Sequence, residues 1–235
     1  MSKQYGNAGQ GARIMAFKRE LIVLGCAVCV FFLAWLWIKN AANIATLGLP
    51  AVIVLIVLFR LVVSSVEKKA KHVKKRAKDA DRGAAAEVKV AEALGGLPEG
   101  FVSFHDLAFP GFNIDHVLVG PAGIFVIETK SHRGKVTAEG DRLLLNGSTP
   151  EKNFINQAWS QTYQLHEHLK KSTGREYQVK PILCFTSAFV QMRQPVKGVA
   201  VINAKFLNEL LKRQPQTLQS NEVNSIVAIM RKQWS

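Results

Sequence analysis

Acidic side chains and a lysine lie near the ends of two predicted buried strands. The apolar run Gly123 to Ile127 is followed by Glu128 and Lys130, which share one face of the strand because side chains two residues apart point the same way. Asp115 lies in the preceding strand, next to apolar Ile114. Burying one carboxylate is costly and a second nearby raises the cost, whereas a divalent cation relieves both. The pattern therefore indicates a site for a hard metal ion, unless Lys130 simply pairs with one of the acids.

A third acid lies on a helix that the periodicity predicts over Ala84 to Leu94, ended by Gly95. Glu87 is at helical spacing from Val90 and Leu94, on the stripe that should face the core, whereas Glu92 points away. A carboxylate on such a stripe is explained if the first turn of the helix opens into a polar site. Glu87 is therefore a candidate partner of the two strand acids.

The periodicity that positions these residues predicts an α/β fold. The turn Gly120 to Gly123 joins two neighbouring strands in a hairpin. The expected strands cover residues 101–107, 113–119, 123–130, 179–185 and 199–202, with a second hairpin over 135–146, and the later helices cover 153–171, 205–213 and 221–231. We expect a mixed sheet flanked by helices, in one domain over residues 83–235 with its own core.

At these residues the sequence resembles the nuclease-related domain family, a branch of the restriction-endonuclease-like nucleases whose core motif is an acid followed by Glu-x-Lys. The resemblance covers about residues 83–169 and is strongest in FNIDHVLVGPAGIFVIETKSHRGKV. It includes the helix GAAAEVKVAEAL and the later NFINQAWSQTYQL, where Gln157 matches the family's glutamine. The chain departs from the family at Phe154, where a proline is usual, and at Leu143 or Leu144, where an aromatic residue is usual. The resemblance implies a restriction-endonuclease-like fold.

The resemblance also implies metal-dependent hydrolysis of phosphodiester bonds in nucleic acid, with DNA the expected substrate. The implied ligands of Mg²⁺ or Mn²⁺ are Asp115, Glu128, the backbone carbonyl of Thr129, and Glu87. Lys130 would polarise the attacking water or stabilise the developing phosphorane, and Gln157 would orient the water or a phosphate. His116 should face away from Asp115 and pack in the core, and His132 is a weaker candidate for contact with phosphate.

Two other functions stay open from the sequence. A catalytically inactive, membrane-tethered module that binds or scaffolds nucleic acid would retain DNA without cleaving it, with an affinity that falls as salt rises. A protein that only supports a lipid-binding surface would bind liposomes and no nucleic acid. The net charge of the domain is +4, from 17 basic and 13 acidic residues between 83 and 235, which does not by itself argue for a polyanionic ligand.

The first 64 residues contain two apolar runs of membrane-spanning length. Leu21 to Ile38 carries no charge over 18 residues, and a second run extends from Ala41 to Phe59 after a short connection. The pattern predicts a two-helix transmembrane hairpin over residues 21–64, preceded by an N-terminal tail at 1–20. A cleavable secretory signal is the alternative for the first run. Cys26 and Cys29 are read as membrane-packing residues rather than as zinc ligands.

A basic segment follows the second run. Val66 to Arg82 contains eight Lys and Arg against three Asp and Glu. We expect residues 65–82 to be a juxtamembrane linker that attracts anionic lipid. Because positive residues are retained in the cytoplasm, the N-terminus and the domain at 83–235 are both expected there, in an integral membrane protein of the inner membrane if the protein is bacterial.

Overall fold

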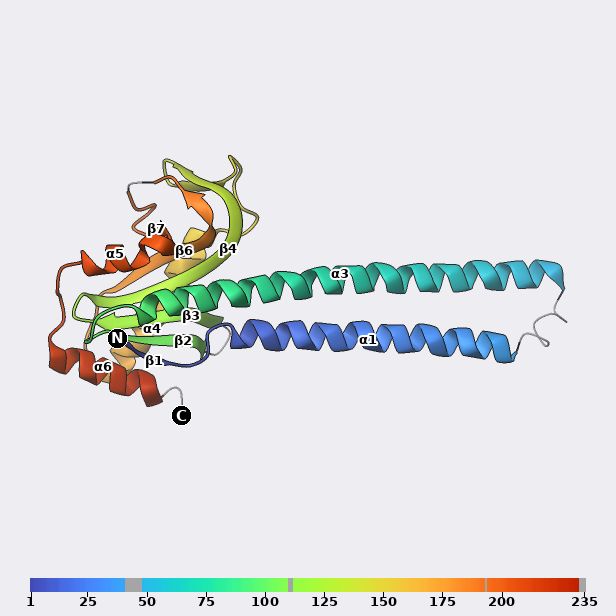
Figure 1. Ribbon diagram of the computed structural model, residues 1–235, viewed down its shortest axis with the longest axis horizontal. Coiled ribbons are helices and arrows are strands. Elements are labelled where there is room, and N and C mark those ends of the chain that lie inside the picture. The colour runs from blue at the N-terminus through green and yellow to red at the C-terminus, as the bar shows by residue number, and fades with distance from the viewer. Residues whose placement is uncertain (41–47, 110–111, 193, 233–235) are drawn as a thin grey trace. The chain divides into compact units, whose positions relative to one another are not determined.

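The computed structural model describes residues 1–40, 48–109, 112–192 and 194–232 (Figure 1). Contacts within the chain divide it into two compact units. One unit combines Met1–Gly11 with Arg82–Ser235, and the other is Ala12–Asp81. Residues 1–20 are predicted from the sequence as a tail, but the first part of that segment belongs to the same unit as the residues after Arg82.

The unit Ala12–Asp81 is helical. It contains α1 (Gln10–Lys39) and the first part of α3 (Leu49–Gly95). Within this unit Trp37 stacks on Phe59 with ring centroids 5.4 Å apart, and Arg19 donates a hydrogen bond of 2.8 Å to the carbonyl of Arg76. The two helices therefore lie side by side inside the unit.

The described residues contain one helix, Arg13–Lys39, that is long and apolar enough to cross a membrane, and no part of its apolar window is buried. The sequence predicts two such spans. The second predicted run, Ala41 to Phe59, begins in residues 41–47, which lie outside the described residues. The structure thus supports one N-terminal apolar helix and does not support the two-span hairpin.

The other unit is built on a mixed sheet in the order β1-β2-β3-β4-β6-β7, with β5 paired to β4. β2 to β5 are successive antiparallel neighbours, whereas β6 runs parallel to β4, β7 parallel to β6, and β1 parallel to β2. The strands are β1 (Lys3–Tyr5), β2 (Val102–Phe109), β3 (Phe112–Gly120), β4 (Gly123–Glu139), β5 (Arg142–Leu145), β6 (Val179–Val190) and β7 (Ala200–Asn203). The predicted α/β class and its mixed sheet are confirmed.

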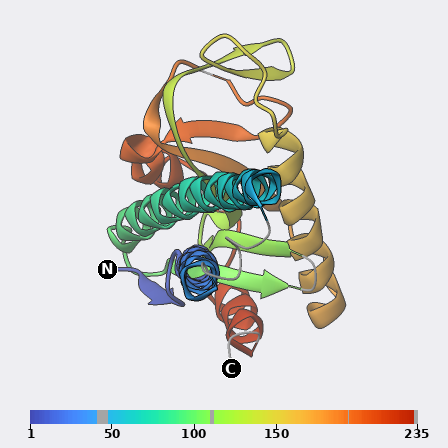
Figure 2. The same cartoon turned by 90° about the vertical axis from the view of Figure 1, so that its right-hand side faces the viewer.

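Helices cover both faces of this sheet (Figure 2). On one face α4 (Phe154–Thr173) and α6 (Ser220–Lys232) pack against side chains of β2, β3 and β4. On the other face the end of α3 packs together with α5 (Leu207–Lys212), which follows the short helix η1 (Ala204–Phe206). The first turn of α4 is fixed by Asn153, whose side chain accepts a hydrogen bond from the backbone N–H of Asn156.

The two central strands separate at the position of the predicted site. β3 and β4 are paired from the hairpin at Gly120 and Gly123 as far as His116 and Ile127. The next residues outward are Asp115 on β3 and Glu128 on β4. From there β4 continues beside β6 and bends, with a shift of register between Lys130 and Arg133. Side chains from the neighbouring strands and from α4 can therefore meet at this point.

The N-terminal segment completes the sheet and packs against α3. β1 pairs with β2 from Lys3 opposite Val102 to Tyr5 opposite Phe104. The side chain of Gln4 donates to the carbonyl of Ala91 in α3 at 2.7 Å. Because strand pairing and helix contacts both tie this segment down, it is a structural part of the domain.

Candidate active site

The centre of the site is a buried carboxylate surrounded by donors. Glu128 is 3% exposed, and its Oε1 atom accepts hydrogen bonds from Lys130 Nζ at 2.5 Å and from Gln157 Nε2 at 2.6 Å. Lys130 Nζ also donates to Gln157 Oε1 at 3.0 Å. Glu128 and Lys130 come from the same face of β4, and Gln157 comes from α4, so the three side chains predicted from the sequence meet directly.

A second glutamine of α4 reaches the same carboxylate. Gln161 Nε2 donates to Glu128 Oε2 at 2.6 Å and to the backbone carbonyl of Asn113 at 3.0 Å. Gln161 is not among the site residues that the sequence predicts. A signal was available, because Gln161 lies one turn after Gln157 and is a polar residue on the buried stripe formed by Ala158 and Leu165.

Asp115 lies beside this group on β3. Its Oδ2 atom accepts a hydrogen bond of 2.7 Å from the backbone N–H of Thr129. Burial raises the pKa of Asp115 well above its ordinary value, and the charges of Glu128 and Glu87 raise it further. The Thr129 N–H and the Lys130 ammonium lower this pKa, but they do not offset the raising effects.

Glu87 enters the site from α3. Burial raises its pKa to about 7, with further raising by the charges of Asp106 and Glu128, and partial lowering by the backbone N–H of Gly9 and by Lys130. The predicted stripe is confirmed, because Val90 and Leu94 are fully buried. Glu87 is therefore within electrostatic range of the strand acids and of the lysine.

Asp106 is a further acid near Glu87 and is not among the site residues that the sequence predicts. Its backbone has a positive φ of 54°, which is uncommon for a residue other than glycine. Its Oδ2 atom accepts a hydrogen bond of 2.5 Å from the backbone N–H of Gly11. Backbone donors of Gly9 and Gly11 thus reach two acids of the domain. Only the folded structure could reveal this contact, because the partners are 95 residues apart in sequence.

The lysine has an aromatic neighbour. Lys130 Nζ lies 4.7 Å from the centroid of the Phe154 ring, in cation–π contact. The His132 ring is 5.1 Å from the same phenylalanine. Burial, followed by the charges of Lys130 and Arg82, lowers the pKa of His132. Phe154, one of the departures from the family pattern, therefore contributes one side of the Lys130 environment.

The histidine after Asp115 belongs to the core. His116 is fully buried, and its Nδ1 atom lies 2.8 Å from Nδ1 of His105 in a hydrogen bond. Burial lowers the pKa of His105 to about 4 and that of His116 well below its ordinary value. Both rings are therefore neutral near pH 7, which agrees with the packing role expected for His116.

The metal site implied by the resemblance has a partial basis in the described residues. No group of three or more His, Cys, Asp and Glu side chains in the described part of the chain is arranged to hold a metal ion. The chemistry nevertheless suits a cation, because burial and the charges of neighbouring acids raise the pKa of Asp115 and Glu87, and the Lys130 ammonium offsets this only in part. Mg²⁺ usually binds proteins through one or two carboxylates and keeps several waters, so a pair of carboxylates is sufficient.

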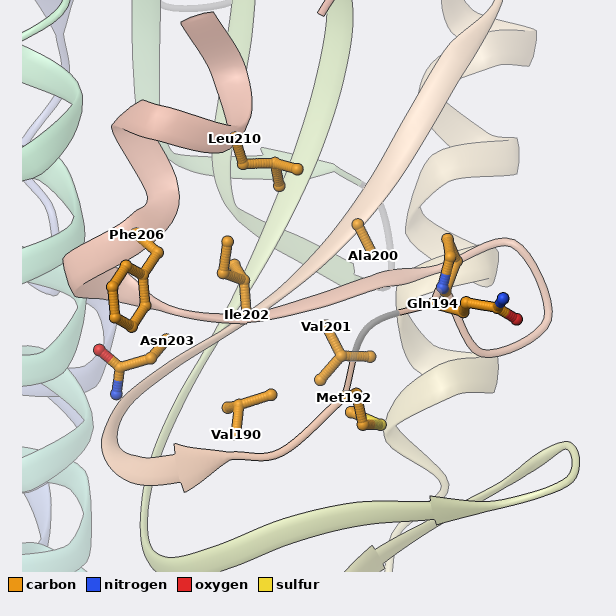
Figure 3. A pocket seen from close by; sticks show the side chains of 10 residues that line it. Val190, Met192, Gln194, Ala200, Val201, Ile202, Asn203, Phe206 and Leu210 are labelled. Carbon is orange, nitrogen blue, oxygen red and sulfur yellow. The ribbon is translucent and has the colours of Figure 1, made fainter. Parts of the chain in front are cut away.

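A separate pocket lies away from these residues. A pocket of about 370 Å³ is lined by the end of β6, by β7, by η1 and by α5, with apolar side chains that include Val190, Met192 and Phe206 (Figure 3). The acids, the lysine and the glutamines described above do not line it. The pocket is therefore a different feature from the carboxylate site.

Part of the chain is similar to a known protein family. No curated protein matches the chain. The chain is similar to protein VC1899 from Vibrio cholerae, a crystal structure, with 11% identity and a TM-score of 0.26; the match covers 93% of this chain and 55% of that one, so this chain spans about half the length of that protein. Residues 82–186 match the sequence model of the family described as "Nuclease-related domain". This segment, which contains the carboxylates, Lys130 and Gln157, is therefore similar to a nuclease-related domain.

Proposed function

We propose that this protein is a metal-dependent nuclease that hydrolyses phosphodiester bonds in nucleic acid, with DNA as its substrate. The observation that carries the proposal is the convergence of Asp115, Glu128 and Lys130, with Glu87 in electrostatic range, inside a nuclease-related domain. Phosphodiester hydrolysis needs neutralisation of the phosphate and an oriented water, and acids that attract a cation beside an ammonium group are suited to both.

The cation in this proposal is Mg²⁺ or Mn²⁺, bound by Asp115 and Glu128 together with the backbone carbonyl of Thr129, and with Glu87 as ligand of a further ion or its water. When bound, it would neutralise the phosphate and lower the pKa of a water. Two features of the chain favour this arrangement. Asp115 is held in one orientation by the Thr129 N–H, and the carboxylates repel one another in the absence of a further positive charge.

Lys130 and Gln157 act on the phosphate and the water in this scheme. The Lys130 ammonium is held by Glu128, by Gln157 Oε1 and by the Phe154 ring, so its position is defined before substrate arrives. A preorganised ammonium stabilises the negative charge that develops on the phosphorane, because no reorganisation is needed during the reaction. Gln157 holds both partners of the ion pair and would orient the attacking water.

The test uses the full chain purified in detergent. Wild type, Lys130→Ala and Asp115→Asn are incubated with single-stranded and double-stranded DNA and RNA, with Mg²⁺, with Mn²⁺ and with a chelator. We expect cleavage of DNA by the wild type in divalent metal only, and none by either variant. Cleavage that survives both substitutions would show a contaminating nuclease or a different site.

A second candidate function is nucleic-acid binding or scaffolding without turnover. It is favoured by one observation, which is that Lys130 and both oxygens of Glu128 are already engaged within the protein. The two functions differ in a binding experiment. An inactive module retains labelled DNA unchanged in every divalent metal and releases it as salt rises.

We further propose that α1 anchors the protein in a membrane. Its aromatic and aliphatic side chains are largely exposed, among them Phe31, Trp35 and Ile38, and the basic residues of the adjacent segment 65–82 would attract anionic lipid. A cleavable signal is disfavoured because cleavage after α1 would remove β1, Gly9 and Gly11 from the folded domain. Membrane flotation of the full chain, with a variant carrying charged residues in α1 as control, tests this attachment.

A further inference from the structure

Gln161 is fixed in one orientation by two acceptors. Its Nε2 atom donates to Glu128 Oε2 and to the carbonyl oxygen of Asn113, at 2.6 and 3.0 Å. Rotation of the amide by half a turn would place its oxygen against two other oxygens, so the assignment of nitrogen and oxygen follows from the contacts. The side chain is 5% exposed, which leaves it little freedom to turn outward.

The other atom of this amide is unsatisfied. Gln161 Oε1 is buried and has no hydrogen-bond partner among the described residues. Buried amide oxygens nearly always accept a hydrogen bond, so an exception needs a physical reason. Here the orphan oxygen is joined by a single carbon to the nitrogen that contacts Glu128, and it is therefore next to the carboxylate expected to bind metal.

The donors on Glu128 are unevenly divided between its two oxygens. Oε1 accepts from Lys130 and from Gln157, whereas Oε2 accepts from Gln161. Each carboxylate oxygen offers about two acceptor positions. Oε1 is therefore filled, and Oε2 keeps one acceptor position beside the one that Gln161 occupies.

We propose that Gln161 is a positioning residue for the divalent cation of the proposed nuclease site. Its nitrogen holds Glu128 so that Oε2 faces the cation, and its oxygen accepts a hydrogen bond from a water molecule on that cation. This inference rests on the proposed function for the location of the cation, but it assigns to Gln161 a contact that can be measured without any cleavage. The two halves of one amide thus fix a ligand and a hydration water.

The test measures Mn²⁺ binding directly, by calorimetry on the full chain in detergent. Gln161→Met keeps the size of the side chain and removes both its donor and its acceptor. Loss of a residue that orients a metal ligand typically weakens metal affinity 10- to 100-fold. We expect a loss in this range for Gln161→Met, and less than a twofold change for Gln164→Met, which lies on the same helix and contacts Ser160 in an exposed position.

The outcomes separate this inference from the proposed function. Weaker Mn²⁺ binding by Gln161→Met supports the inference even if no nucleic acid is cleaved, in which case only the nuclease proposal fails. Unchanged Mn²⁺ affinity overturns the inference even if the wild type cleaves DNA, and so does a wild type that binds no Mn²⁺. A purely structural role would lower the melting temperature in chelator and leave Mn²⁺ affinity as it was. If Gln161→Met does not fold, Gln161→Asn, which keeps an amide but is shorter, decides by the same measurement.

Discussion

Lys130 and Glu128 form a buried ion pair in which both charged groups contact the same third residue. The ammonium donates to Glu128 Oε1 and to Gln157 Oε1, and Gln157 Nε2 donates back to Glu128 Oε1. The three groups close a ring of hydrogen bonds between β4 and α4. Because each member has two partners in the ring, removal of one leaves the other two in contact.

This ring leads to a prediction for Lys130→Ala. We expect at least a 100-fold loss of cleavage, because the ammonium that stabilises the phosphorane is removed. The fold should persist, because Gln157 and Gln161 still donate to Glu128, so the free energy of unfolding should fall by less than the 3–5 kcal/mol usual for a broken buried pair. Cleavage assays and thermal denaturation measure the two effects. Lys135→Ala, an exposed lysine on the same strand, is the control, and equal activity of both variants would contradict a role for Lys130.

Asp115→Asn should separate activity from stability. The substitution removes a partly buried carboxyl whose ionised form Glu128 and Glu87 disfavour, while an amide oxygen can still accept from the Thr129 N–H. We expect cleavage to be lost and the free energy of unfolding at pH 8 in chelator to rise, since a carboxyl whose pKa is raised by folding costs stability when it is ionised. Chemical denaturation measures this change. A clear loss of stability instead would show that the ionised carboxylate is a net structural contact.

The pH dependence of stability follows from the raised pKa values. Glu87, with a pKa of about 7 against an ordinary 4.5, and Asp115, also raised, bind protons more tightly in the folded than in the unfolded state. The contribution of Glu87 to stability is therefore complete below about pH 4.5 and is lost as pH rises through about 7, and Asp115 contributes in the same direction.

In melting experiments without metal, this contribution should make the temperature of unfolding fall between pH 5 and pH 8. The fall should be smaller in Glu87→Gln and in the presence of Mg²⁺, because the first removes the titrating group and the second stabilises its charged form. The same fall in Glu87→Gln as in wild type would mean that Glu87 titrates normally.

Gly9 offers a test of the N-terminal segment. Its φ is +76°, and a Cβ at this position would lie 2.8 Å from the Cα of Ala84. Gly9→Ala should therefore lower the free energy of unfolding by about 2 kcal/mol, from backbone strain and displacement of the segment, and should weaken the contact to Glu87. Gly140→Ala is a matched control, because Gly140 also has a positive φ but an added Cβ would meet nothing within 4 Å. Equal effects of the two substitutions would show that strain alone, and not contact with α3, accounts for the loss.

The elements after residue 83 could be predicted from the sequence because their signals are local. The hairpin at Gly120 to Gly123, the second turn at Gly140 and the helix from Phe154 each carry turn or cap residues beside a clear hydrophobic period. The contact among Glu128, Lys130 and Gln157 is also predictable from the sequence. Glu128 and Lys130 share a strand face, and Gln157 matches the glutamine of the family that the sequence resembles.

The remaining features depend on contacts between distant parts of the chain. β1 has three residues and no alternation to mark it, so its pairing with β2 follows only from the folded arrangement. Asp106 is likewise recognised as part of the site only through its hydrogen bond with Gly11, because no sequence motif marks it. The two-span hairpin is predicted from hydropathy, which gives length and apolarity but no evidence of what surrounds a helix.

The parallel pairing of Lys3 with Val102 has a consequence for the order of assembly. During synthesis the first strand must wait until its partner has left the ribosome, and the chain between them is made in the meantime. Contacts of such large sequence separation close slowly, because the entropy of the intervening chain is lost before the pairing is gained. The β1 edge of the sheet should therefore form late. A rearranged chain that joins residues 1–11 directly to the domain should fold faster than the natural chain, in which Ala12–Asp81 separates them.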